Sequence, residues 1–352
     1  MKFNAVIGNP PYQADLKGDN KTYRDGLYPA FIDFAKAVSS TVLFIVPAKF
    51  LFNFSSKLQK WALLELQSHH MKVVKYFADC EQVFSKVGLR GGLAVVLWDS
   101  LQTFESVAEK YAPVGVFIPY PELESIVKKV ITPSFQSLID YAYSRTSYRY
   151  SKKLYQDHPE LVQKATKGHL FDLGTKAFIK TPEIFYDSPP DDGHTYIAVA
   201  GLYKLQLMTK YIRADYIYNV AHRNIDKYKV FVSRVTGRGN FGETISRVFV
   251  AYPHMSHTET FLSIGAFDDS ASAQATVKYI KTKFARTMLD ILKITSSCAR
   301  NKWRWVPVQN FTEQSDIDWK TSISEIDQQL YRKYNLTQAE INFIENNVKP
   351  ME

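Results

Sequence analysis

Residues 2–12, KFNAVIGNPPY, join a short apolar segment to a loop that holds two consecutive prolines. The segment is rich in residues that favour β-structure, and Gly8 and the prolines end it, so it predicts a buried β-strand. In doubly wound α/β sheets, ligands bind just beyond the carboxyl ends of the strands. We therefore expect a binding or catalytic site in the loop from Asn9 to Tyr12.

The chain after this loop alternates helix and strand patterns. Residues 27–38, LYPAFIDFAKAV, predict a helix with one apolar face. The expected buried positions on that face are Leu27, Phe31, Phe34, Ala35 and Val38. Residues 41–52, 73–77 and 91–100 predict further strands, and residues 55–70 predict a second helix. Because the strands are continuously apolar and amphipathic helices separate them, we predict a mostly parallel α/β sheet covered on both faces.

Past residue 130 the pattern changes to longer loops, aromatic clusters and shorter strands. We predict three domains: residues 1–135 with the sheet, residues 136–310 of α+β structure, and a helical tail over residues 311–352. In the tail, 8 acidic side chains outnumber 4 basic ones. Thr337 and Glu340 have the spacing of a capping box, which predicts a helix that starts there.

Composition describes a globular, basic protein. The 352 residues are 45% hydrophobic and 22% charged, which excludes wholesale disorder, and the formal net charge is +9. A basic chain with 22 tyrosines and 23 phenylalanines favours a nucleic-acid partner. Cys80 and Cys298 cannot form a disulfide framework and suit a reducing cytoplasm. The histidines lack metal-ligand spacing and the apolar runs are too short for a membrane span, so we expect neither a metal nor a membrane partner.

The loop chemistry follows from its residue types. Asn9 offers a side-chain amide oxygen and Pro10 a carbonyl, and both accept hydrogen bonds from an exocyclic amino group such as that of adenine. Pro10 and Pro11 stiffen the loop and remove two backbone donors. Tyr12 would stack on a base swung out of the duplex. The alternative is a proline-rich turn that only ends a strand.

The order of these strings resembles the gamma class of N6-adenine DNA methyltransferases. That family has an apolar strand followed by Gly-Asn-Pro-Pro-Tyr, as in AVIGNPPY here. It continues with elements similar to LYPAFIDFA, VLFIVPAKFL, CEQVFSKV and GGLAVVLWD. The downstream half, with strings such as DKYKVFVSR and WVPVQNF, resembles the target-recognition region of restriction–modification methylases. The resemblance covers nearly the whole chain.

This resemblance implies an incomplete doubly wound, Rossmann-like methyltransferase sheet that lacks its first strands. The family binds S-adenosylmethionine mainly through motifs that precede the NPPY strand, so the implied cofactor contacts here are reduced to Gly8 and Asn9. The strand at residues 2–8 would expose an unpaired edge, and a partner subunit or a longer form of the chain would supply the missing part. Trp98, with Phe84 as the alternative, would stack on the second face of the flipped base.

Residues 237–242, GRGNFG, match the glycine-rich pattern G-x-G-x-x-G. It lies in the second half of the chain, and no acidic residue follows at the spacing of a ribose contact. We interpret it as a flexible loop that faces DNA rather than as a cofactor site.

Two basic, aromatic segments predict contacts with double-stranded DNA. Residues 141–156 carry four basic side chains, five tyrosines and no acid, and residues 201–240 carry eight basic and two acidic side chains. The alternative is a solvated face with tyrosines that cover a core. The side chains expected to contact DNA are Arg145, Arg149, Lys152, Lys153, Arg234 and Arg238.

The sequence therefore predicts the catalytic-loop and target-recognition part of a site-specific adenine-N6 DNA methyltransferase of a restriction–modification system, bacterial or phage-encoded and cytoplasmic. Its catalytic residues would be Asn9, Pro10, Pro11, Tyr12 and Trp98. The alternative function is a non-catalytic DNA-binding specificity subunit. Capacity to bind the cofactor distinguishes the two.

Overall fold

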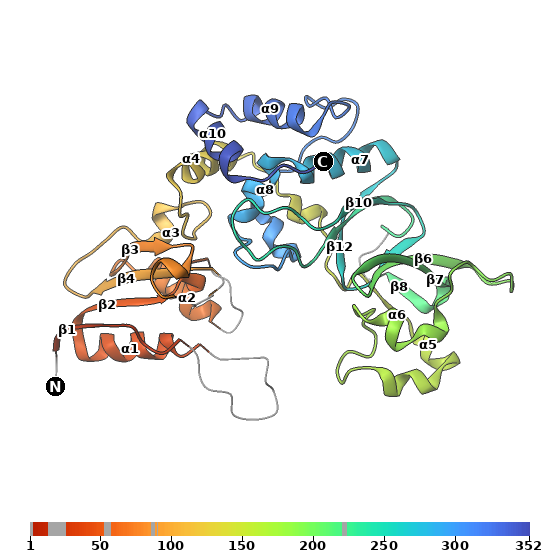
Figure 1. Cartoon of the computed structure of the whole chain (residues 1–352), viewed down its shortest axis with the longest axis horizontal. Coiled ribbons are helices and arrows are strands. Elements are labelled where there is room, and N and C mark those ends of the chain that lie inside the picture. The colour runs from red at the N-terminus through yellow and green to blue at the C-terminus, as the bar shows by residue number, and fades with distance from the viewer. Residues whose placement is uncertain (1–2, 13–25, 53–57, 86–88, 90, 220–223) are drawn as a thin grey trace. The chain divides into compact units, whose positions relative to one another are not determined.

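The computed structural model describes residues 3–12, 26–52, 58–85, 89, 91–219 and 224–352, which form a mixed α/β structure. The chain divides into two compact units, Met1–Lys128 and Lys129–Glu352 (Figure 1). The division into three functional domains stays a prediction. Within the described part of the chain, no helix is both long enough and apolar enough to cross a membrane.

The first unit is built on a four-stranded sheet in the order β1-β2-β4-β3. Its strands are β1 (Phe3–Gly8), β2 (Ser39–Pro47), β3 (Met71–Phe77) and β4 (Leu93–Asp99). β1 is parallel to β2, whereas β4 is antiparallel to both β2 and β3. The prediction of a mostly parallel sheet is therefore wrong for β4. The described residues between β3 and β4 form no crossover helix, and a strand that returns without one enters the sheet antiparallel.

The helices of the first unit are α1 (Tyr28–Val38), α2 (Gln59–Gln67) and α3 (Val107–Lys110), and α4 (Pro121–Val130) spans the division between the units. α1 packs against β2 and buries Tyr28, Ile32 and Ala35. Phe31 and Phe34 are 40% and 67% exposed, so the predicted apolar face is wrong for these two residues, whereas Ala35 is buried as predicted. The i, i+4, i+7 spacing of the three buried residues defines the face that packs on the sheet.

β1 is an edge strand with exposed side chains. Among the described residues it pairs with β2 alone. Phe3 is 51% exposed and Ile7 is 74% exposed. The predicted strand is therefore present, but the prediction that it is buried is wrong. An apolar β-pattern identifies a strand but not whether neighbours cover both of its faces.

The described residues of the second unit form three small sheets, in the orders β10-β9-β12, β11-β6-β7 and β5-β8. Its strands are β5 (Tyr148–Tyr150), β6 (Tyr196–Tyr203), β7 (Gln206–Arg213), β8 (Ile217–Asn219), β9 (Tyr228–Ser233), β10 (Val248–Ala251), β11 (Met255–His257) and β12 (Phe261–Phe267). β6 and β7 form an antiparallel hairpin, and β9 is antiparallel to β10 and β12.

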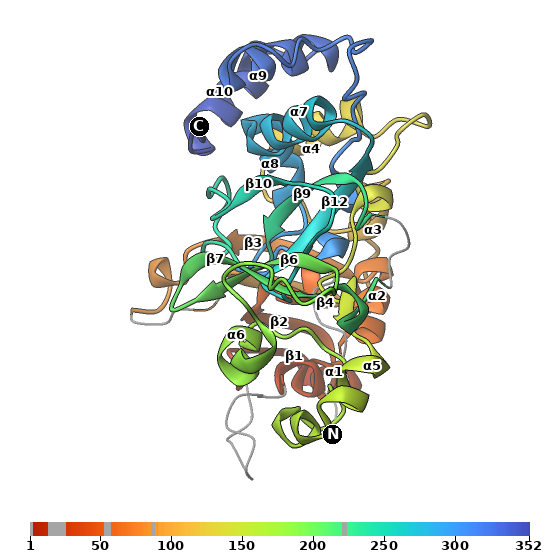
Figure 2. The ribbon, with the colours of Figure 1, turned by 90° about the vertical axis from the view of Figure 1, so that its right-hand side faces the viewer.

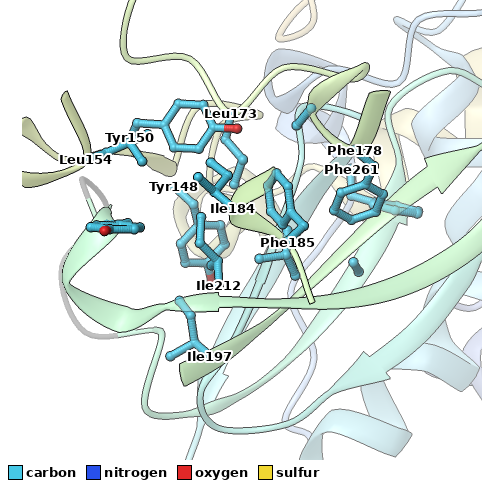
Figure 3. Close-up of a cluster of buried hydrophobic side chains, with 14 of the residues drawn as sticks. Tyr148, Tyr150, Leu154, Leu173, Phe178, Ile184, Phe185, Ile197, Ile212 and Phe261 are labelled. Carbon is cyan, nitrogen blue, oxygen red and sulfur yellow. The ribbon is translucent and has the colours of Figure 1, made fainter. Parts of the chain in front are cut away.

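The core of this unit is largely aromatic. Figure 3 shows Phe178, Phe185 and Phe261 beside Ile184, with Tyr148 nearby, and all of them are buried. Phe178 and Phe185 meet edge to face, with ring centroids 4.9 Å apart, an arrangement that aromatic quadrupoles favour.

The helices of the second unit are α5 (Lys152–Asp157), α6 (Ala177–Lys180), α7 (Ser270–Lys281), α8 (Lys283–Asp290), α9 (Ile323–Lys333) and α10 (Gln338–Asn347). They lie on two sides of its sheets, with α5 and α6 on one side and α7, α8, α9 and α10 on the other (Figures 1 and 2). α7 packs on β9 and β10, and α8 packs against α7, α9 and α10. The capping box predicted at Thr337 and Glu340 is confirmed at the start of α10.

Candidate functional site

The loop Asn9–Tyr12 lies at the edge of the first sheet where β1 ends. Register places Gly8 beside Phe44 of β2, while the end of β2 at Pro47 and the end of β3 at Phe77 both face Leu93, the first residue of β4. The same edge therefore gathers the segments that follow β1, β2 and β3 and the one that precedes β4. Side chains from segments far apart in sequence meet at such an edge.

Gly92 shapes this edge just before β4. Its φ is +79°, and a Cβ at this position would lie 2.3 Å from the Phe77 carbonyl oxygen. Its own carbonyl accepts a hydrogen bond from the Ala48 N–H, 3.0 Å away, at the start of the turn after β2. A glycine is required here because any side chain would push the ends of β3 and β4 apart.

Tyr12 is anchored at both its backbone and its side chain. Its carbonyl accepts a hydrogen bond of 3.1 Å from the Leu27 N–H, which ties the loop to the start of α1. Its hydroxyl donates to the Ile45 carbonyl of β2 over 3.5 Å. Burial, with a smaller contribution from Cys80, raises the pKa of Tyr12 to about 12, and a hydrogen bond with the Asn9 side chain opposes that rise. The phenol is therefore neutral at physiological pH.

Asn9, Pro10 and Pro11 complete the loop. Pro10 is buried, while Asn9 and Pro11 are exposed. The Asn9 side chain reaches the Tyr12 hydroxyl. The predicted residues of the loop thus lie together at the end of β1, where Asn9 and Pro11 are exposed, Tyr12 is half-buried and Gly8, the predicted cofactor contact, is exposed.

Trp98 does not lie with the loop, and this prediction requires correction. Because β4 runs antiparallel, Trp98 pairs with Val42 and Met71 and not with residues at the loop edge. It is 3% exposed, and its indole N–H donates to the carboxylate of Glu65 in α2. Lys36 of α1 lies 4.9 Å from the ring centroid. Trp98 therefore has no free ring face for a base.

Phe84, the alternative aromatic residue, lies on the loop's edge of the sheet. It follows β3 and the short 3-10 turn Cys80–Gln82, and its backbone N–H donates to the Cys80 carbonyl over 2.9 Å. Its side chain is half-buried. Cys80 itself is buried and lies close enough to Tyr12 to raise the pKa of Tyr12, although it was not among the predicted site residues. No sequence signal identifies that contact, because it joins the ends of β1 and β3.

In the second unit, three of the predicted DNA-contacting arginines surround two carboxylates. Arg145 forms an ion pair with Glu259, and Arg149 forms one with Asp172 at 2.9 Å. The Arg234 Nε donates to the Glu259 backbone carbonyl over 3.2 Å. Burial is the largest cause of the lowered pKa of Arg234 and of the raised pKa of Glu259. The arginines are held in fixed orientations, which favours specific contacts over diffuse ones.

A cavity of about 250 Å³ adjoins this cluster. Arg145, Asp172 and Glu259 line it, together with basic side chains from the neighbouring segments. Those basic side chains are Lys164, His169, Lys176 and Lys180.

The remaining three predicted DNA contacts lie outside this cluster. Lys152 and Lys153 are exposed at the start of α5, where Lys153 is paired with Asp157 one turn later. Arg238 is exposed in the glycine-rich loop.

The glycine-rich loop is held by carboxylates. The backbone N–H groups of Arg238 and Gly239 donate to the Glu243 carboxylate over 2.7 and 2.8 Å, and the Gly242 N–H donates to Asp290 over 2.7 Å. These amides are occupied by protein anions and so are not available to a phosphate. The bonds also tie the loop to Glu243 and to Asp290 of α8, and its contact with DNA stays a prediction.

No group of three or more histidine, cysteine or carboxylate side chains suited to a metal ion occurs among the described residues.

Comparisons with known proteins find similarity to methylases. Residues 1–84 match the family model described as Eco57I restriction-modification methylase. A curated protein of Mycoplasma pneumoniae (strain ATCC 29342 / M129 / Subtype 1), named "Uncharacterized adenine-specific methylase", is 30% identical over 111 residues. That match covers 28% of this chain and 24% of the relative, so it spans about a quarter of the relative's length.

Two solved structures are similar over most of the chain but at low scores. The type IIG restriction endonuclease BpuSI is 9% identical with a TM-score of 0.34, covering 98% of this chain and 54% of that one. The type IIL restriction-modification enzyme MmeI, in complex with DNA, is 10% identical with a TM-score of 0.41, covering 97% of this chain and 56% of that one.

Proposed function

We propose that the chain is the catalytic-loop and target-recognition part of a DNA methyltransferase that modifies N6 of adenine in a restriction–modification system. The observation that carries the proposal is the loop Asn9–Tyr12, exposed at the carboxyl end of β1 with its tyrosine anchored to β2. The match of residues 1–84 to a restriction-modification methylase model and the adenine-specific methylase relative support it.

In this proposal the loop holds the amino group of a flipped adenine. The Asn9 side-chain oxygen and the Pro10 carbonyl accept its two N–H bonds, which draws the nitrogen toward tetrahedral geometry and frees its lone pair for attack. The contact between the Asn9 side chain and the Tyr12 hydroxyl would orient the amide so that its oxygen accepts from the target amine. No general base is needed before attack, since the proton leaves afterwards.

Tyr12 stacks on one face of the base, and we assign the second face to Phe84. Phe84 is half-buried and follows β3 at the same edge as the loop, whereas Trp98 is enclosed by α1 and α2. Stacking between two aromatic rings offsets part of the cost of taking a base out of the duplex.

S-adenosylmethionine would supply the methyl group, and Gly8 and Asn9 are the residues of this chain that would contact it. The exposed edge of β1 leaves room for further strands beside them. Phe3 and Ile7 of β1 and Phe34 of α1 are more than half exposed, as in a sheet that continues beyond this edge. We propose that a partner subunit, or a further part of the same protein, pairs with β1 and completes the cofactor site.

Double-stranded DNA would contact the second unit through the arginines around Glu259 and Asp172. When a carboxylate fixes a guanidinium, the remaining N–H groups of the guanidinium are aligned for bidentate contact with a base edge. Exposed Lys152 and Arg238 would contact phosphates.

The test is product identification. The chain is expressed with and without the reading frames that flank it in its source, and host DNA is digested to nucleosides for mass spectrometry. The proposal predicts N6-methyladenine, in greatest amount when a partner that binds β1 is present. Methylation of cytosine would contradict it. Tight, sequence-specific DNA binding without methylation under any combination would favour the alternative of a non-catalytic specificity subunit.

A further inference from the structure

The turn of the β6–β7 hairpin has an unfavourable backbone. Tyr203 pairs with Gln206, so the turn consists of Lys204 and Leu205. Their φ angles are +48° and +68°. Two-residue hairpin turns with positive φ at both positions normally contain Asn-Gly, because other side chains collide with their own backbone in this conformation. A lysine followed by a γ-branched leucine is therefore a costly choice at this turn.

The contacts around the turn hold this conformation without using the leucine side chain. The Arg247 Nη2 donates to the Leu205 carbonyl over 3.0 Å. The Lys204 ammonium lies 5.4 Å from the centroid of the Tyr203 ring. Leu205 is 83% exposed, so burial within this chain does not offset the cost of its backbone. Strain that the fold does not require points to a role outside the fold.

The hairpin end is suited to a groove of duplex DNA. Leu207, two residues past the tip, is 43% exposed, and residues 203–207 are all exposed, so the tip stands clear of the core. From Tyr196 to Arg213 the hairpin carries Lys204, Lys210 and Arg213 and no acidic residue. Lys210 pairs with Asp187, and Arg213 pairs with Asp157 and Asp215, so Lys204 is the cation at the tip. A two-stranded β-ribbon fits a DNA groove, and apolar side chains on such elements insert between base pairs and kink the duplex.

We propose that Leu205 is a wedge that inserts between neighbouring base pairs of duplex DNA, while Lys204 contacts an adjacent phosphate. The positive-φ turn presents the two side chains outward together. The inference rests on the proposed function, in which this chain acts on duplex DNA. It adds a residue that deforms the duplex at a position other than the target base.

The first experiment measures DNA bending by energy transfer between fluorophores at the two ends of a short duplex, using the full chain. Leu205→Ala is compared with Leu101→Ala, because Leu101 is 81% exposed and lies in a turn of the first unit. We expect the wild type and Leu101→Ala to give equal bending. Leu205→Ala should lose more than half of the change in energy transfer, with duplex affinity reduced by no more than about tenfold, since phosphate contacts remain. Equal bending by Leu205→Ala and the wild type would overturn the proposal.

A second variant separates a wedge from a structural residue. The double substitution Lys204→Asn and Leu205→Gly installs the preferred turn, so the melting temperature should rise by roughly 2–8 °C while bending is lost. A lower melting temperature would show that Leu205 supports the fold and would overturn the proposal. If the wild type binds duplex DNA without bending it, the wedge alone is contradicted. If it does not bind duplex DNA at all, the proposed function fails as well.

Discussion

Trp98 connects three elements of the first unit through one side chain. Its indole N–H donates to the Glu65 carboxylate of α2, and the other oxygen of that carboxylate pairs with Lys36 of α1 at 2.6 Å. Lys36 also lies over the Trp98 ring. With Trp98 on β4, these contacts fix both helices to the sheet.

Substitution of Trp98 should therefore act on stability. Trp98→Ala removes a large buried side chain and should lower the free energy of unfolding by about 3–5 kcal/mol. Trp98→Phe keeps most of the volume but leaves a Glu65 oxygen without its donor, at a cost of about 1–3 kcal/mol. Urea denaturation measures both. A Trp98→Ala protein of unchanged stability would contradict this assignment.

His257 is a buried, neutral residue in the second unit. Its ring meets the edges of Tyr148 and Phe231 with centroids 4.9 and 4.8 Å away, and its Nδ1 lies 2.9 Å from the Thr258 carbonyl. Its Nε2 has no hydrogen-bond partner among the described residues. Burial lowers the pKa of His257 to about 4 from 6.5.

This pKa sets a pH window for stability. Between about pH 6.5 and pH 4 the unfolded chain binds a proton at His257 that the folded protein does not, so stability is lost as the pH falls through this window. The loss from this group is about 3 kcal/mol. Buried Asp290 and Asp327, whose pKa values are raised to about 7 and about 6, have the opposite effect, so the wild-type curve alone does not isolate His257.

Comparison with His257→Phe removes that ambiguity. The substitution keeps the aromatic packing and removes the titrating group. The free energy of unfolding of His257→Phe should therefore increase relative to that of the wild type as the pH falls from 6.5 to 4. Chemical denaturation at several pH values measures the difference. Parallel stability curves for the two proteins would contradict a neutral buried His257.

At the scale of elements, the start of α10 is determined by residues close together in the sequence. The Thr337 hydroxyl accepts from the Glu340 N–H, and the Glu340 carboxylate accepts from the Thr337 N–H over 2.6 Å. The same carboxylate pairs with Lys129 at 2.6 Å. Thr337→Ala should cost about 1 kcal/mol of unfolding free energy, measured in urea with Thr103→Ala, an exposed threonine outside a helix, as the control. A cost equal to that of the control would show that the Lys129 pair alone fixes the helix start.

Other properties of elements required the tertiary structure. Periodicity located α1 but chose the face with Phe31 and Phe34, because several apolar faces overlap in a helix this rich in apolar residues. The apolar run at residues 91–100 located β4 but carried no direction, and its antiparallel entry moved Trp98 away from the loop. The loop Asn9–Tyr12 was predictable because its chemistry lies in consecutive residues, whereas Cys80 beside Tyr12 was not.

At the scale of the whole molecule, DNA affinity should depend on salt through the unpaired basic side chains. Arg145 and Arg149 are neutralised in part by Glu259 and Asp172, whereas exposed Lys152 and Arg238 have no ion pair in the described structure. Replacing Lys152 or Arg238 by glutamine should each flatten the slope of log affinity against log salt by about 0.9.

The control for this prediction is Lys320→Gln, an exposed lysine in the acidic C-terminal segment, which should leave the slope unchanged. Filter binding between low and physiological ionic strength measures the slopes. An affinity that does not change with salt would mean that the basic side chains are only a solvated surface.

The proposed active site depends on Asn9 as the acceptor that binds the amine. The most direct measurement is the rate of methyl incorporation into DNA by the active assembly, with Asn9→Ala compared with Asn346→Ala, an exposed asparagine in α10. Asn9→Ala should lower the rate by about 10²–10³, the typical effect of removing one preorganised polar contact at a reacting centre. Asn346→Ala should retain the wild-type rate, and both variants should bind duplex DNA normally. Normal methylation by Asn9→Ala would show that the loop is only a turn and would contradict the proposed active site.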